Sequence, residues 1–142
     1  MIKEFDIKNR SKAVADLARE YLARAKAMIG SEDTWVKEVA AYNEDGELVN
    51  AMSEGAVMWC AWGALQASGM SAVAREAATM ALGKTVIDDP RFFAGKDFCA
   101  ITAIWDFNDS EKTDHNTVML AFDAAVENVD DIAEFLVDRS EW

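Results

Sequence analysis

The chain has 142 residues, of which 51% are hydrophobic and 28% charged, so it can form one compact domain over residues 1–142. Its 14 Lys and Arg against 26 Asp and Glu give a formal net charge of −12, which disfavours nucleic acid and anionic membranes as partners. One His and two Cys are a small supply of catalytic and metal-binding side chains. We therefore predict no cofactor and no metal.

The charge is unevenly distributed along the chain. Residues 1–29 contain seven bases and four acids, a net charge of +3, so residues 30–142 carry −15. Residues 106–142 contain eleven acids and two bases, a net charge of −9. We expect the negative potential to concentrate in this last part.

Targeting signals are not evident in the sequence. The first residues alternate charged and apolar side chains, without the continuous apolar segment of a secretory signal. The longest apolar run, residues 55–65, is shorter than the roughly 20 residues that cross a bilayer. We expect a cytoplasmic protein whose Cys60 and Cys99, both in apolar segments, are reduced and buried.

Hydrophobic periodicity predicts an amphipathic helix over residues 12–29, stopped by Gly30. Residues 35–42 and 47–49 flank an Asn-Glu-Asp-Gly turn and predict a small β-hairpin. A run from residue 53 to residue 68 is apolar on nearly every face and predicts the central, buried helix.

The second half of the chain predicts further helices. Ser71 caps one over residues 72–82, with Gly83 as its end; residues 85–96 form an irregular loop whose Phe92 and Phe93 pack inward. Another helix covers residues 97–105 and is followed by a polar loop from Asn108. Asp114 caps the next helix, and Asn128 or Asp130 starts the last. The predicted fold is mainly α, about six helices with one β-hairpin.

Two segments share a pattern of aromatic, Cys, Ala, large, small, Ala, large at residues 59–65 and 98–104. The pattern fits a duplicated unit or a cooperating cysteine pair, but two core helices crossing at small residues explain it more simply. A Cys–His dyad would need His115, which falls in the first turn of a helix and is expected at the surface. We assign this motif a structural role; its residues are Trp59, Cys60, Gly63 and Cys99.

Residues 106–114 match part of a calcium-binding loop. Asp106, Asn108, Ser110 and Asp114 stand at the first, third, fifth and ninth places, but Glu111 replaces the turn glycine and Thr117 the last carboxylate. Loop and cap roles are therefore favoured for these residues over a metal site.

Several of these features together resemble a family of small bacterial and phage-encoded proteins known as a domain of unknown function. They are the first amphipathic helix, the Asp45-Gly46 hairpin, the Trp-Cys-Ala-x-Gly-Ala-Leu segment at residues 59–65, and the late Asn-Asp pair before a capped helix. The resemblance covers about residues 10–128. Phe107 and Asp114 stand where relatives have Trp and Thr; the first change argues against a ligand contact there. The resemblance implies the fold but no activity.

Three functions compete on these grounds. The first is a non-enzymatic binding or inhibitor-type protein, of phage or mobile-element origin, whose acidic body engages a basic protein partner. The second is an enzyme or small-molecule-binding domain with a pocket near the 106–109 loop, lined by Trp35 and Phe107, with Trp105, Asp106, Asn108 and Asp109 as the candidate site residues. The third is self-assembly, in which the first helix docks on the acidic end of a neighbouring copy.

Overall fold

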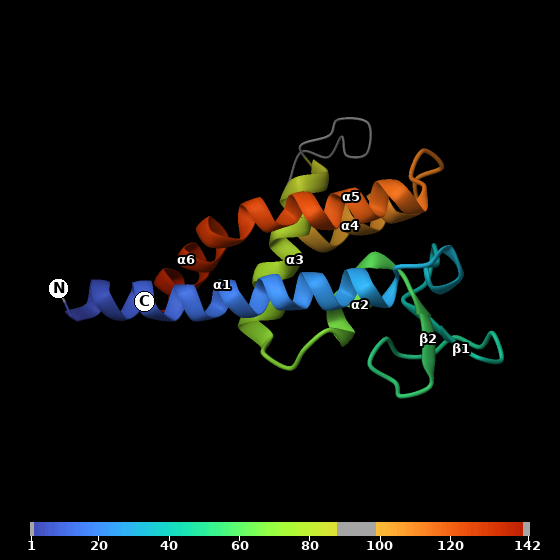
Figure 1. Cartoon of the computed structure of the whole chain (residues 1–142), viewed down its shortest axis with the longest axis horizontal. Coiled ribbons are helices and arrows are strands. Elements are labelled where there is room, and N and C mark those ends of the chain that lie inside the picture. Colours follow the sequence, from blue (N-terminus) through green and yellow to red (C-terminus); the bar gives the residue numbers. More distant parts are fainter. Residues whose placement is uncertain (1, 88–98, 141–142) are drawn as a thin grey trace.

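Helices dominate the computed structural model, which describes residues 2–87 and 99–140 (Figure 1). These residues form six α-helices, two short 3-10 helices and one two-stranded antiparallel sheet, which confirms the predicted fold class. The prediction for Phe92 and Phe93, and the start of a helix at residue 97, lie outside the described residues. Within the described part, no helix is both long and apolar enough to cross a membrane.

The longest helix, α1, spans Ile2–Met28 and begins ten residues before the predicted start. From Ala18 on, its buried side chains recur every three or four positions, at Leu22 and Ala25, and Ile29 continues the series just after the helix. This side packs mainly against α6, α3 and α2. The helix stops before Gly30, as predicted.

The sheet pairs β1 (Ala41–Asn43) with β2 (Ala56–Trp59), in the register Ala41 to Trp59 and Tyr42 to Met58. The predicted turn is present, since Gly46 has a φ of +76° and Tyr42 forms a bridge with Leu48. The predicted strands over residues 35–42 and 47–49 are wrong, because β1 is shorter and pairs with β2. The helix predicted from Ser53 is wrong over its first part, because those residues form a turn and β2. When every residue of a run is apolar, the spacing of apolar residues cannot distinguish a buried strand from a buried helix.

The central helix is α3 (Ala72–Ile87), which packs against α1, α4, α5 and α6, whereas α2 is short (Ala61–Ala67). The prediction that residues 53–68 form the central helix is therefore wrong. The predicted end at Gly83 is also wrong. A Cβ on Gly83 would lie 2.7 Å from the Cα of Ala100, so this glycine lets α3 and α4 approach closely.

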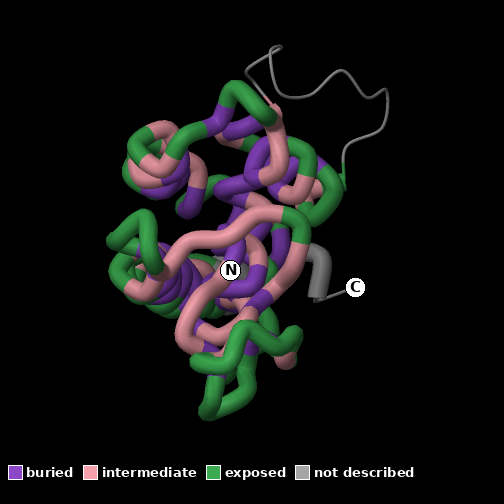
Figure 2. Tube along the Cα trace, turned by 90° about the vertical axis from the view of Figure 1, so that its right-hand side faces the viewer, coloured by how far each residue is buried: buried purple, intermediate pink, exposed green. Residues whose placement is uncertain are grey.

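The chain closes with α4 (Ala100–Asp109), α5 (His115–Ala125) and α6 (Val129–Ser140). As predicted, Asp114 caps α5, accepting a hydrogen bond from the Thr117 backbone N–H at 2.8 Å. Buried stretches gather where these helices face α1 and α3, whereas the hairpin loops are exposed (Figure 2). The first turns of α1 and the last turns of α6 lie at the end of the molecule away from the sheet (Figure 1).

Candidate functional site

Asn108 is a fully buried amide in the last turn of α4. Its Oδ1 accepts hydrogen bonds from Trp35 Nε1 at 2.7 Å and from the Ala61 backbone N–H at 3.0 Å. Its Nδ2 donates to the Val36 carbonyl and to Asp109 Oδ1, both at 3.0 Å. Both donors and both acceptor sites of the amide are thus used within the chain. Asn108 ties α4 to the segment before the sheet and to the start of α2.

The neighbouring Asp109 extends this set of contacts. Its Oδ1 also accepts a hydrogen bond from the Glu38 backbone N–H at 2.8 Å, and Glu38 has a φ of +72°, in the left-handed region. Lys37 Nζ donates to the Ser110 carbonyl at 2.7 Å and lies 5.5 Å from the centre of the Trp35 ring. We call these residues the polar latch: Trp35, Lys37, Glu38, Asn108 and Asp109.

The prediction of a loop at residues 106–109 is wrong, because these residues are helical and α4 ends at Asp109. Asn and Asp are typical loop residues when their side chains bond nearby backbone groups. Here the Asn108 side chain bonds groups more than 40 residues away, which leaves its own backbone free for the helix.

The four candidate site residues have different surroundings. Asn108 and Asp109 meet in the polar latch. Trp105 is half-buried and packs on Trp62, with ring centroids 5.7 Å apart, whereas Asp106 is exposed. Binding by these residues stays a prediction.

His115 is half-buried, and the prediction that it is a surface side chain is wrong. Its Nε2 lies 2.6 Å from the Ile29 carbonyl, at the end of α1, and its ring centroid is 6.0 Å from that of Trp35. The carbonyl groups at a helix end lack partners within the helix. By donating a hydrogen bond to the Ile29 carbonyl, His115 Nε2 supplies such a partner and joins α5 to α1.

The Trp59–Gly63 segment makes contacts within the chain, and its structural role stays a prediction. Trp59 Nε1 donates to the Ala51 carbonyl at 3.1 Å, and Cys60 Sγ caps α2 by accepting from the Gly63 N–H at 3.2 Å. Burial raises the pKa of the Cys60 thiol to about 11, so it is a poor nucleophile. A Cβ on Gly63 would lie 2.3 Å from the Ala40 carbonyl oxygen, so this glycine admits a close backbone.

Cys99 precedes α4 and is exposed, so the prediction that it is buried is wrong. The Thr102 side chain and backbone lower the pKa of the Cys99 thiol. Cys99 lines a hollow of about 510 Å³ between α3 and α4; its other polar lining residues are Gln66, Arg75, Glu76 and Thr79.

The residues of the partial calcium pattern serve other contacts. Asn108 uses its amide in the polar latch, Asp114 caps α5, and Ser110 Oγ accepts from the Lys112 N–H at 3.2 Å. Within residues 2–87 and 99–140, no group of three or more His, Cys, Asp or Glu is placed to hold a metal ion.

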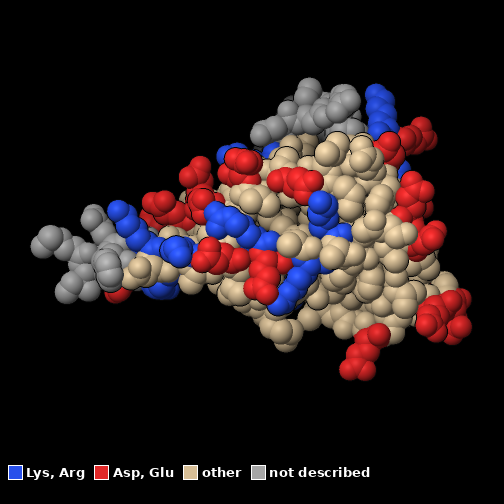
Figure 3. Space-filling model, viewed as in Figure 1, with Lys and Arg blue, Asp and Glu red and all other residues tan. Residues whose placement is uncertain are grey.

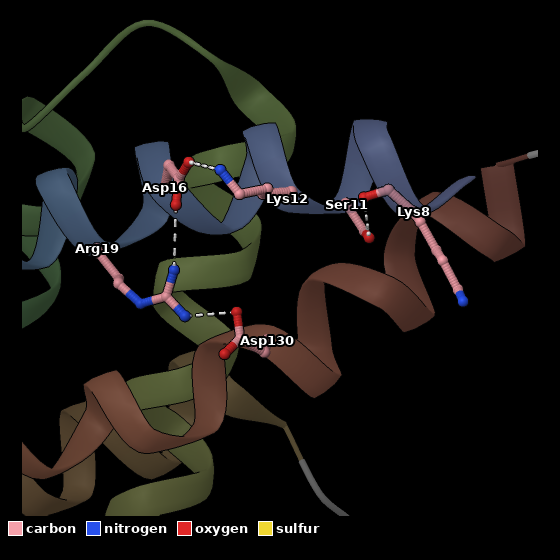
Figure 4. A network of polar contacts seen from close by, with 6 residues as sticks. All are labelled: Lys8, Ser11, Lys12, Asp16, Arg19 and Asp130. Carbon is pink, nitrogen blue, oxygen red and sulfur yellow. Dashed lines mark hydrogen bonds and ion pairs between the residues drawn. The ribbon is translucent and has the colours of Figure 1, made fainter. Parts of the chain in front are cut away.

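The bases of α1 pair with acids of the same chain. Arg19 bonds Asp130 of α6 and Asp16 of its own helix (Figure 4), and Lys26 Nζ lies 2.7 Å from Asp123 of α5. Arg24 pairs with Glu20. The positive charge of α1 is thus partly neutralised by acids of α5 and α6 in its own chain.

The acids around the sheet lack basic partners among the described residues, whereas Asp123 of α5 and Asp130 of α6 pair with bases of α1. Residues 30–59 contain seven acids and one base, Lys37, whose ammonium group is held by Ser110. All seven acids are exposed, and none of them forms an ion pair in the described part of the chain. Four of them lie between β1 and β2: Glu44, Asp45, Glu47 and Glu54. Acidic side chains project at this end of the molecule (Figure 3). We call these four residues the acidic hairpin.

The sequence did not identify Lys37 and Glu38 as members of the polar latch, or His115 as the residue that joins α5 to α1. Glu rarely adopts a positive φ, so no residue type signalled the conformation of Glu38. His115 follows a helix cap directly, and that position alone does not show that a second helix ends against it.

Comparison with known proteins adds a family and nothing beyond it. No curated protein and no solved structure matches the chain. A family model matches residues 14–128, and these residues include the polar latch, the sheet and helices α2 to α5. Over these residues the chain matches a family of unknown function, DUF6197, and it belongs to that family.

Proposed function

We propose that the protein is a non-enzymatic binding protein, of the inhibitor type, whose acidic surface engages a basic protein partner. The acidic hairpin is the observation that carries the proposal: its four carboxylates are exposed and have no cation beside them among the described residues. Such a surface attracts a basic partner from a distance and favours it over acidic proteins.

Four of the side chains that could take part in catalysis are instead used in contacts within the chain, which supports binding over catalysis. The Asn108 amide is fully bonded, Asp109 holds the Glu38 N–H, His115 holds the Ile29 carbonyl, and Cys60 is buried with a raised pKa. A general base or nucleophile needs an open side toward a substrate. These four groups instead join helices and loops.

The experiment is capture of partners by the tagged full chain from its host lysate, at about 50 mM and about 500 mM salt. A charge-driven partner is retained at low salt and lost at high salt. A variant with Glu44→Gln, Asp45→Asn and Glu54→Gln should lose it. Failure to retain any protein at low salt would contradict the proposal.

A matched control neutralises three acids of α6, through Asp131→Asn, Glu134→Gln and Asp138→Asn, and removes the same charge from another surface. It should keep the partner. The mobile-element origin implied by the resemblance also has a test, since phage or defence genes beside the gene support an inhibitor and a metabolic operon argues against it.

A small-molecule-binding or enzymatic role is the second candidate, and the hollow between α3 and α4 favours it. Its volume of about 510 Å³ falls in the range of ligand sites. Unlike the predicted pocket, it takes its α4 lining from Ala100 and Ile101 and not from residues 105–109. A ligand screen by thermal shift tests it, since a hit should lose its effect in Thr79→Val and Met80→Ala but not in Asp106→Asn.

A further inference from the structure

A groove lined by methionines lies between the end of α1, the turn before β2 and the link from α2 to α3. Its volume is about 420 Å³. Met28, Met52 and Met70 line it, and Trp59 contributes an aromatic side chain. Met52 and Met70 are 50% and 83% exposed, which is unusual for large apolar side chains. Methionine is flexible and polarisable, and it is common where a surface takes bulky apolar side chains of a partner.

An acidic hollow adjoins the methionine groove. Its volume is about 380 Å³, and its lining includes Glu44, Asp45 and Glu54 of the acidic hairpin. Glu54 lines the groove as well as the hollow, so the two share a wall. An apolar pocket and a cluster of carboxylates therefore stand next to each other on one side of the molecule.

Among the residues that line the groove, Glu54 is the charged side chain without an ion pair in the described part of the chain. Arg24 lines the groove, but its guanidinium bonds Glu20 and the Ser68 carbonyl. Arg75 is not among the lining residues, and it approaches two uncharged acceptors, Met52 Sδ and the Gln66 carbonyl. Glu54 has no such cationic partner within the described residues. A ligand that presents a cation beside an apolar group complements this arrangement.

We propose that the methionine groove and the acidic hollow together bind a basic amphipathic segment of a partner protein, with its apolar side chains in the groove and Lys or Arg in the hollow. Amphipathic segments dock in this way when apolar anchors seat in a groove and charges at the rim fix their direction. The inference rests on the proposed function and names the surface that carries it.

The experiment uses the full chain labelled with ¹³C at its methionine methyl groups, and a synthetic helical peptide of about 15 residues made of Leu and Lys at amphipathic spacing. The methyl signals of Met28, Met52 and Met70 should shift on titration, whereas those of Met80 and Met119 should not. A peptide with Glu in place of Lys should shift none of them. Shifts confined to other methionines, or no shifts, would overturn the inference.

Substitutions separate the apolar and the charged parts. Met52→Gln with Met70→Gln should weaken peptide binding about tenfold, because both apolar contacts are lost. Glu54→Gln should weaken it about threefold at low salt and have little effect at high salt. The matched controls are Leu120→Gln, which removes an apolar side chain that is 59% exposed on α5, and Glu127→Gln. Equal losses in the controls would show nonspecific adhesion and overturn the inference.

Two further outcomes are informative. If the methionine signals change with protein concentration and without peptide, a second copy of the chain occupies the groove and the inference is wrong. If the captured host partner depends on salt but survives Met52→Gln with Met70→Gln, the proposed function stands and the groove is not its site. Loss of the partner in the methionine variant and its retention in Leu120→Gln supports both.

Discussion

The indole Nε1 of Trp35 donates a hydrogen bond of 2.7 Å to Oδ1 of Asn108, a residue 73 positions further along the chain. The same oxygen accepts the Ala61 N–H. One buried amide thus fixes the loop before the sheet, the start of α2 and the end of α4. We read the polar latch as the element that sets the position of the acidic hairpin on the helices.

The polar latch predicts a large effect of Asn108→Ala. The substitution leaves Trp35 Nε1, the Ala61 N–H and the Val36 carbonyl without their partner in a buried site. Each unsatisfied buried group costs about 1–3 kcal/mol, so we expect unfolding in urea to show a loss of about 3 kcal/mol or more. Asp106→Ala, on the exposed side of the same helix turn, should change the free energy of unfolding by less than about 0.5 kcal/mol.

Gly83→Ala tests whether an added methyl group at this position raises or lowers the free energy of unfolding. Helix propensity alone predicts that Ala stabilises this helical position by about 1 kcal/mol. The added Cβ would lie 2.7 Å from the Cα and Cβ of Ala100, so we expect a net destabilisation of about 2 kcal/mol. Chemical denaturation measures it, with Lys84→Ala at the exposed neighbouring position as the control. A more stable Gly83→Ala protein would contradict the close contact between α3 and α4.

The cap of α5 predicts a pH dependence. Hydrogen bonds from the Thr117 hydroxyl and backbone N–H lower the pKa of Asp114 below its usual 3.8. The folded chain therefore holds the carboxylate more strongly than the unfolded chain. The stabilisation is complete above the unfolded pKa and is lost as pH falls through the folded one. The Tm of Asp114→Ala should lie below that of the wild type at neutral pH.

The gap in Tm should begin to close below pH about 3.8 and narrow further as the pH falls through the lower pKa of the folded cap. Asp114→Thr keeps a capping oxygen without the charge. Its Tm should fall less than that of Asp114→Ala, and the difference from Asp114→Ala should not change with pH. A gap that is constant from pH about 2 to about 7 would count against the cap.

The two thiols should react very differently with a disulfide reagent. Cys99 is exposed and its pKa is lowered, whereas Cys60 is buried with a pKa of about 11. At pH about 8 we expect one rapidly labelled thiol, absent in Cys99→Ser and slower in Thr102→Val, because the thiolate is the reactive form. Cys60 should react only on unfolding. Rapid labelling of two thiols in the native protein would be the contrary result.

Local signals were enough for part of the fold. The three-to-four spacing from Ala18 to Ile29 and the cap at Asp114 depend only on nearby residues, and the structure confirms both. The strand Ala56–Trp59 was not predictable in the same way, because its apolar run suits a buried helix as well as a strand. Its conformation is set by pairing with β1, which lies earlier in the chain.

The candidate site is likewise predictable from the sequence only in part. The sequence marks Asn108 and Asp109 as residues of interest, but residue type alone assigns them to a loop. Their helical conformation depends on Trp35, Ala61 and Glu38, which are brought close only by the fold. In the same way, Gly83 reads as a helix stop until the approach of Ala100 is known.

The separation of Trp35 and Asn108 along the chain has a consequence for synthesis on the ribosome. Asn108 follows Trp35 by 73 residues, which at about 5–20 residues per second is a delay of roughly 4–15 s. During this time β1 and β2 have been made but lack the amide that anchors them. We expect the sheet to dock late, after α4 has emerged, and the chain to be most open to proteases and chaperones before then.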